Sequence, residues 1–409
     1  MPALNTGDTA FLLVSAALVM LMTPALGLFY GGMVRRKNVL GTIMHSFFVL
    51  GLVSVLWAVI GYTLAFGPGG SPFVGGLKWL CLSGVGQAPN SDYAATVPHL
   101  AFMVFQLMFA VITPALITGA FAERMKFSAF VSFIIAWSLL VYSPICHWVW
   151  GTGGWIRSLG VLDFAGGTVV HISSGAAALA AAIVIGHRSR NSLEPMSPHN
   201  VPLTILGAAM LWFGWFGFNA GSALTSAGLA ASAFVVTHLS AAAATLSWVL
   251  VEWKHRGKPT TLGAASGCVT GLVAITPASG FVGPMAALAI GLIAGAVCYL
   301  AVQLKRPLNY DDSLDVVGVH GVGGIIGALG TGVFASLAVN AAGANGLVYG
   351  NVHLLLMQAV AVGAVIGYSF TVSFVLLKVI DFAWGLRVSE EHEEVGLDLT
   401  QHSEAGYAW

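Results

Sequence analysis

Apolar runs of about twenty residues recur along the whole chain, and they constrain its fold more than any other feature. A helix of that length crosses the ~30 Å hydrocarbon core of a bilayer. Only 8% of the residues are charged and the mean hydropathy is +0.87, whereas soluble domains carry about 25% charged residues. The short alternating segments of a membrane β-barrel are missing. We therefore predict an all-α integral membrane protein embedded in a lipid bilayer.

Hydropathy predicts eleven transmembrane helices followed by a polar tail. The predicted spans lie near residues 9–31, 40–66, 98–120, 128–146, 165–186, 202–220, 227–252, 261–280, 283–304, 316–337 and 351–380. No charged segment precedes the first run, so we expect a mature helix there and not a signal peptide. The membrane domain would then occupy residues 1–380 and the tail residues 381–409, with no large soluble domain.

The basic residues fall almost entirely in alternate loops. Of the 16 Lys and Arg residues, only Lys78 and Arg157 lie in the other set. The rest are Arg35, Arg36, Lys37, Arg124, Lys126, Arg188, Arg190, Lys254, Arg256, Lys258, Lys305, Arg306, Lys378 and Arg387. Loops rich in Lys and Arg face the cytoplasm. We predict a protein of the cell (inner or plasma) membrane, with its N-terminus outside and its tail in the cytoplasm.

Two segments share the same spacing between an acid and a histidine. DFAGGTVVHIS, in the fifth span, places Asp163 eight residues before His171, and DSLDVVGVHGV, in the tenth, places Asp312 eight residues before His320. Because the two spans are five apart, they cross the membrane in opposite directions, which is typical of an inverted repeat. We predict a 5+5 inverted repeat, plus an eleventh helix, with repeats at about residues 9–186 and 202–337.

The spacing also predicts where the histidines lie. Eight residues of helix rise ~12 Å, and half of the hydrocarbon core is ~15 Å, so His171 and His320 would meet near the midplane from opposite faces. A helix that begins at Asp315 would shift His320 by about one turn. A single intramembrane histidine is often a satisfied core residue, but a matched pair indicates a pathway for a solute or a proton. For Asp163 and Asp312 the simpler explanation is helix capping.

Several function classes are disfavoured by the sequence. It has no nucleophile elbow, HExxH or phosphate-binding loop, so we expect no catalytic residues and no cofactor. Two histidines without a third ligand make a poor metal site, and zero net charge argues against a nucleic-acid partner. The four cysteines lack metal spacing and are expected to be apolar filler, although a disulfide between Cys81 and Cys146 stays open.

Aromatic side chains gather at the predicted outer ends of the third, fourth and sixth spans. They are Phe102, Phe105 and Phe109, Trp150, and Trp215, Phe216 and Phe218, with the hydroxyl of Ser222 nearby. One interpretation is an aromatic belt at the membrane interface. The other is a vestibule that binds a small cation through cation–π contacts.

Long motifs, in order along the whole chain, resemble the ammonium transporter (Amt/Mep/Rh) superfamily, on its Amt side. They are GLFYGGMVRRKNVL (27–40), FQLMFA (105–110), GAFAERMKFSA (119–129), DFAGGTVVHISSGAAALAAA (163–182), GWFGFNAGSA (214–223), DVVGVHGVGGIIG (315–327) and GLRVSEEHEEVGLD (385–398). The resemblance implies a homotrimer with one pore in each eleven-helix subunit. It also implies a tail similar to those that receive PII-type regulatory proteins.

The resemblance assigns roles to particular residues. The outer substrate site would comprise Phe109, Trp150, Phe218 and Ser222, with Phe109 and Phe218 as a stacked gate. Trp215 and Phe105 would line the pore, His171 and His320 would form its twin histidines, and Asp163 would support the outer site.

Together these observations predict a transporter of ammonium, and of methylammonium if the site admits it. Ammonium would lose its proton at the outer site and ammonia would pass the histidines. A separate proton relay would make net transport electrogenic, whereas a pore without the relay would be an electroneutral, Rh-like gas channel. A third alternative is an ammonium sensor that signals through its tail. An enzyme that uses the two histidines as acid and base is disfavoured, because no nucleophile or metal set accompanies them.

Overall fold

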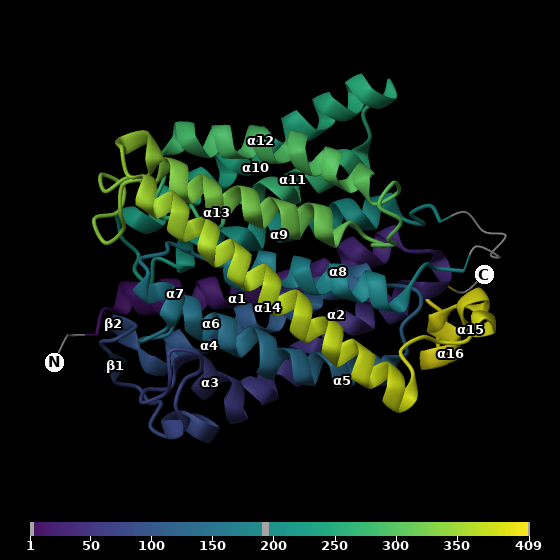
Figure 1. The fold of residues 1–409 in the computed structure, drawn as a ribbon, viewed down its shortest axis with the longest axis horizontal. Helices are drawn as coiled ribbons and strands as arrows, with labels where there is room; N and C mark the ends of the chain where they lie inside the picture. The colour runs from purple at the N-terminus through teal and green to yellow at the C-terminus, as the bar shows by residue number, and fades with distance from the viewer. Residues whose placement is uncertain (1–3, 190–195, 408–409) are drawn as a thin grey trace.

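The computed structural model describes residues 4–189 and 196–407, so Arg190 lies outside the described residues. Long helices run between two ends of the molecule (Figure 1). The N-terminus, the short strands β1 (Pro89–Asn90) and β2 (Ala94–Pro98) and helix α7 (Trp155–Ser158) lie at one end, here called the N-terminal face. Helices α15 (Glu390–Val395) and α16 (Leu397–His402) lie at the opposite end, the tail face.

Within the described residues, eleven helical runs lie between the two faces. The first five are α1 (Thr6–Met33); α2 (Val39–Leu56) with η2 (Trp57–Gly61) and α3 (Tyr62–Phe66); α4 (His99–Ile117); α5 (Phe127–Trp137) with η5 (Ser138–Tyr142) and α6 (Ser143–Trp150); and η6 (Gly167–Ile172) with α8 (Ser173–Ile185). The others are α9 (Val201–Gly221), α10 (Gly228–Arg256), α11 (Thr261–Ile275), α12 (Pro284–Leu304), η7 (Val317–Val322) with α13 (Gly323–Phe334), and α14 (Val352–Trp384). Short 3-10 turns are η1 (Arg36–Asn38), η3 (Leu77–Leu82), η4 (Thr118–Ala120) and η8 (Leu347–Tyr349). The predicted all-helical membrane fold is confirmed, because ten of the described runs are long and apolar enough to span a bilayer and α11 is a shorter apolar helix.

One predicted span, 261–280, is too long. Helix α11 ends at Ile275, and the residues from Thr276 to Val282 continue as buried, non-helical chain. Pro277 follows the helix end, and proline cannot continue an α-helix without loss of a backbone hydrogen bond. The carbonyl of Pro277 instead accepts a hydrogen bond of 3.1 Å from the backbone N–H of Phe164. The non-helical segment after α11 therefore forms a hydrogen bond between the two halves of the chain.

The two repeats pack against each other through small residues. Helices α1 and α9, the first of each repeat, lie along one another, and a Cβ atom built on Gly207 would be 2.4 Å from the backbone nitrogen of Phe29. In the same way, a Cβ atom on Gly175 of α8 would be 2.3 Å from the Cα atom of Gly321 in η7. Glycine at these positions lets the helix backbones approach closely, as in other membrane bundles.

The histidine-bearing helices of both repeats begin in the same unusual way. Each opens with a six-residue π-helix, η6 or η7, and these contain His171 and His320. Both begin several residues after the acid, at Gly167 and Val317. The estimate of ~12 Å of helix between acid and histidine is therefore wrong, because the first residues after each acid are not helical.

The tail packs on the loops at the tail face. The backbone N–H of Lys126 donates to the Leu386 carbonyl (2.8 Å), and that of Val388 donates to the Arg124 carbonyl (3.1 Å). The Asp398 carboxylate accepts hydrogen bonds from the backbone N–H groups of residues 40 and 41. These contacts hold the tail against the ends of α2, α4 and α5.

Candidate functional site

A cavity of about 480 Å³ opens among the loops and helix ends of the N-terminal face. Its lining includes Trp150, Asp163 and Ser222, three of the residues that the sequence singles out. The remaining walls are Phe66, Asp92, Tyr93, Phe102, Gln106, Val149, Arg157, Gly160, Val161, Leu162, Phe164, Leu224, Phe281, Ala342, Gly343 and Ala344. We call this space the vestibule.

The vestibule adjoins a cluster of aromatic rings, here called the aromatic floor, through Trp150, which lines the cavity. The Phe109 and Phe218 ring centroids are 4.3 Å apart, and the Trp150 ring stands at 90° to that of Phe109 with 5.8 Å between centroids. The Phe105 ring also contacts that of Phe109, with 5.0 Å between centroids. Helices α4, α6 and α9 thus bring together four aromatic side chains from distant parts of the sequence.

Polar contacts fix the position of these groups. The Trp150 Nε1–H donates to the Asp163 carbonyl (2.8 Å), and Nη1 of Arg157 donates to the Trp150 carbonyl (2.6 Å). The Ser222 hydroxyl donates to the Phe218 carbonyl (2.8 Å). Because its proton is used in that bond, the Ser222 oxygen has lone pairs left to accept a hydrogen bond from a donor in the vestibule.

Asp163 organises the start of η6 from beneath the vestibule. Its carboxylate accepts from the backbone N–H groups of Gly166 (2.8 Å), Gly167 (2.7 Å), Thr168 (2.8 Å) and Val169 (3.3 Å), and from the Thr168 hydroxyl. The residue directly before η6 is Gly166, with a φ of 118° that favours glycine. The carboxylate therefore binds the helix start across a tight turn and does not occupy the adjacent N-cap position.

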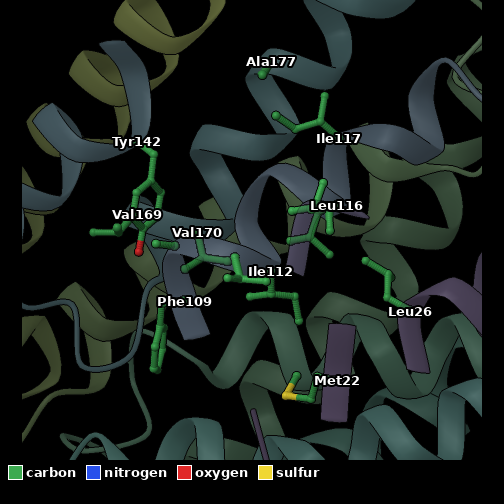
Figure 2. Close-up of a cluster of buried hydrophobic side chains, with 14 of the residues drawn as sticks. Met22, Leu26, Phe109, Ile112, Leu116, Ile117, Tyr142, Val169, Val170 and Ala177 are labelled. Carbon is green, nitrogen blue, oxygen red and sulfur yellow. The ribbon is translucent and has the colours of Figure 1, made fainter. Parts of the chain in front are cut away.

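Below the aromatic floor the lumen is narrow and apolar. The cavity there has a volume of about 10 Å³. It is lined by Met22, Leu26, Ile112, Leu116, Val170, Leu211, Trp215, Phe218 and Val269, and by His171 and His320. Figure 2 shows Met22, Leu26, Ile112, Leu116 and Val170 in one cluster, with Phe109 beside it. A cavity of this size holds about one water-sized molecule.

The two histidines contact each other in this lumen. Their Nδ1 atoms are 3.3 Å apart, their ring centroids 5.4 Å apart, and both residues are buried. The His171 ring also stacks on Trp215, with 5.5 Å between centroids. The Trp215 Nε1–H donates to the Thr276 hydroxyl (2.9 Å), which fixes the orientation of the indole. Within the described residues, His171 Nε2 is buried with no hydrogen-bond partner.

Comparison with known proteins identifies the family of this chain. The model of the Ammonium Transporter Family matches residues 10–407. An ammonium transporter of Bacillus subtilis (strain 168) is 55% identical over 405 residues, which is 99% of each chain. The chain belongs to the ammonium transporter family.

Solved structures of family members have the same fold. The crystal structure of Candida albicans Mep2 aligns with a TM-score of 0.91 at 37% identity, over 98% of this chain and 90% of that one. A sensor Amt protein aligns with a TM-score of 0.88 at 29% identity, over 97% and 98% of the two chains. Ammonium transport is thus the function that both family and relatives indicate.

A second large cavity of this family member, about 610 Å³, opens at the tail face. Arg188 lies in its wall, where it forms ion pairs with Asp311 (2.9 Å) and Glu123 (3.0 Å). Burial opposes ionisation of Glu123, but the guanidiniums of Arg188 and Arg35 outweigh that effect and hold its pKa below the usual value. Lys305 pairs with Asp315 in the same wall. The two wide cavities lie at opposite faces, and the narrow lumen contains the histidines.

Sequence reasoning missed most of the lumen walls and the contact between Trp215 and Thr276. Leu26 lines the lumen while Leu13 of the same helix is 48% exposed, yet both are leucines in an evenly apolar run. In a membrane helix hydropathy does not distinguish a pore-facing side from a lipid-facing side. The four cysteines are free, and three of them are buried.

Proposed function

We propose that ammonium binds in the vestibule, loses its proton there, and crosses the lumen as ammonia past His171 and His320, with a separate proton relay through the histidines. The vestibule would face the cell exterior, as the distribution of Lys and Arg predicts. Recruitment would use the faces of Phe109 and Trp150, which attract a cation, together with the Ser222 oxygen as acceptor. The observation that carries the proposal is the contact of two histidines in an apolar lumen.

Energetics favour deprotonation over passage of the ion. Transfer of a bare ion of this size to a low-dielectric medium costs of order 20 kcal/mol before relaxation. Removal of the proton from ammonium, with a pKa of about 9, costs ~3 kcal/mol at pH 7, at ~1.36 kcal/mol per pH unit. The lumen cavity of about 10 Å³ supports this choice, since a hydrated ion does not fit.

The histidine pair suits a solute without charge. When both rings are neutral, the short contact between the Nδ1 atoms requires one of them to donate and the other to accept. The first ring then has an Nε2 lone pair and the second an Nε2–H. The pair therefore offers ammonia one acceptor and one donor. Transfer of a proton between such rings is the chemistry of a relay near neutral pH.

Replacement of both histidines tests this mechanism. We expect the double variant His171→Gln, His320→Gln to abolish the ammonium-evoked current of proteoliposomes on a solid-supported membrane, because amides form hydrogen bonds but do not relay protons. Ammonia flux, measured in parallel by a pH-sensitive dye, should persist. The matched control is His238→Ala, an exposed histidine of the spanning helix α10, which should leave both signals unchanged.

Each outcome distinguishes the alternatives. An unchanged current in the double variant would remove the histidines from proton transfer. Ammonia flux without any current in the wild-type protein would favour an electroneutral gas channel.

A second candidate function is ammonium sensing, because a protein described as a sensor Amt protein shares the fold over nearly the full length of both chains. Growth rescue of a transport-deficient strain at low ammonium separates the two, since a pure sensor would not restore growth. We also propose a homotrimer, and a PII-type protein as a partner at the tail face. Cross-linking in membranes and co-purification with such a protein would test these assemblies.

A further inference from the structure

The vestibule contains one polar atom whose role is not explained by the proposed site. Gln106 lines the cavity together with Trp150 and Ser222. Its side chain is 9% exposed, and among residues 4–189 and 196–407 its Oε1 atom is buried without a hydrogen-bond partner. A buried carbonyl oxygen without a partner is destabilising, so native structures rarely keep one without a reason.

The position of Gln106 on α4 connects it to the aromatic floor. It lies three residues before Phe109, and residues three apart lie on the same side of a helix. Phe109 contacts both Phe218 and Trp150. The amide is therefore one helical turn from the ring that would bind the cation, on the side of α4 that faces the vestibule.

An ammonium ion in this vestibule needs more acceptors than the proposed site supplies. It has four N–H donors, and aromatic faces satisfy them only weakly. The Ser222 oxygen is one acceptor, and an amide carbonyl is a second with two lone pairs.

We propose that Gln106 is a binding residue of the vestibule, whose carbonyl oxygen accepts a hydrogen bond from ammonium; the inference rests on the proposed function. The oxygen and nitrogen of an amide are distinguished only by their hydrogen bonds. No group in the described chain forms a hydrogen bond to Oε1. Rotation of the side-chain amide by half a turn therefore brings the oxygen to the cavity without breaking a hydrogen bond of that atom.

The test compares Gln106→Leu with Gln106→Glu in the proteoliposome assay. Leucine removes the acceptor at similar volume, so the half-saturating ammonium concentration should rise about 10-fold or more, the loss expected for one hydrogen bond to a charged group. The maximal current should stay within about 2-fold. Glutamate keeps an acceptor, so its half-saturating concentration should equal the wild-type value or fall below it.

A control and a folding check complete the design. Gln87→Leu makes the same change in an exposed loop residue between η3 and β1, outside the vestibule lining, and should behave as wild type. If Gln106→Leu does not fold, Gln106→Met replaces it, and thermal melting in detergent with increasing ammonium chloride reports binding without transport.

The possible failures are distinguishable. A lower maximal current with an unchanged half-saturating concentration would mean a purely structural role, and an unchanged response would equally overturn the proposal. In both cases wild-type ammonium currents persist, so the proposed function stands. Absence of any ammonium response in the wild-type protein would instead refute the proposed function itself.

Discussion

Asp163 and Asp312 occupy equivalent places in the two repeats, each eight residues before a histidine that lines the lumen, yet their surroundings differ. Both oxygens of Asp163 accept hydrogen bonds, from consecutive backbone N–H groups and the Thr168 hydroxyl. Asp312 accepts one, from the Val317 N–H (2.7 Å). Its Oδ1 atom is buried without a partner in the part of the chain that the structure describes.

This difference shows how one sequence pattern acquires two physical roles. At the N-terminal face the carboxylate is saturated with donors, and its turn also provides the carbonyl that anchors Trp150. At the tail face burial raises the pKa of Asp312 to about 6, and the Asp315 carboxylate adds to that effect, while Lys305 and the Val317 N–H oppose it. The first acid organises a site, whereas the second is poised to gain a proton.

Removal of the Asp163 carboxylate should produce the largest effect. Asp163→Ala leaves several buried N–H groups unpaired, and hydrogen bonds to a charged group contribute ~1.5–3 kcal/mol each. We expect the free energy of unfolding to fall by about 3–5 kcal/mol and ammonium uptake to fall more than about 10-fold. Thermal melting in detergent and radiolabelled methylammonium uptake measure the two effects.

The matched variant is Asp312→Ala, which removes one hydrogen bond to the carboxylate and should cost less than about 3 kcal/mol. Equal losses of unfolding free energy in the two variants would show that the two carboxylates contribute equally to stability.

A pair of glycines tests the contact between the repeats with a smaller expected effect. A Cβ atom on Gly175 would be 2.3 Å from the Cα atom of Gly321, but one on Gly321 would be 3.5 Å from the Cα atom of Gly175. Gly175→Ala therefore requires a backbone shift and should cost about 2–3 kcal/mol, in the range of overpacked cores. Gly321→Ala makes an ordinary van der Waals contact and should be tolerated within ~1 kcal/mol.

Melting temperatures of the two alanine variants provide the measurement. The two glycines set the separation of the helices that carry His171 and His320, so a backbone shift at this contact would also change the lumen. A Gly321→Ala variant that is less stable than Gly175→Ala would contradict the packing described.

The spans and the approach of the two histidines could be predicted from sequence, for a simple reason. A bilayer requires long apolar helices, and an inverted repeat places equivalent residues at mirrored depths. His171 and His320 illustrate this, because they hold the same place in two spans of opposite direction and their Nδ1 atoms lie 3.3 Å apart.

The start of the two histidine-bearing helices could not be predicted in the same way. The residues between Asp163 and Gly167 are held out of the helix by the carboxylate itself and by the positive φ of Gly166. These are tertiary and turn effects that hydropathy does not record. The end of α11 differs too, because its continuation, residues 276–282, is buried but not helical, and Pro277 lies directly after the helix end. Burial in protein makes such backbone tolerable at membrane depth.

The pH dependence of stability should show the smallest effect, and it sharpens the contrast between the two acids. The folded-state pKa of Asp312, about 6, lies above the ordinary value of 3.8, so the native state binds the proton more tightly than the unfolded chain does. The stabilisation from this group is complete below about pH 4 and is lost as the pH rises through about 6. We expect Asp312→Asn to abolish this decline, a difference of about 1–3 kcal/mol at ~1.36 kcal/mol per pH unit.

Melting in detergent from pH 4.5 to pH 7.5 would reveal that slope, and the neighbouring Asp311 provides the control. Although burial opposes its ionisation, hydrogen bonds and charge from Arg188 hold the pKa of Asp311 well below its usual range. Asp311→Asn should therefore lower stability by a similar amount across this pH window, because it breaks the ion pair with Arg188, and it should leave the slope intact. Parallel curves of melting temperature against pH for wild type and Asp312→Asn would show that the unpartnered oxygen does not make Asp312 a proton acceptor. Asp312 and Asp163 would then differ only in the number of hydrogen bonds that they accept.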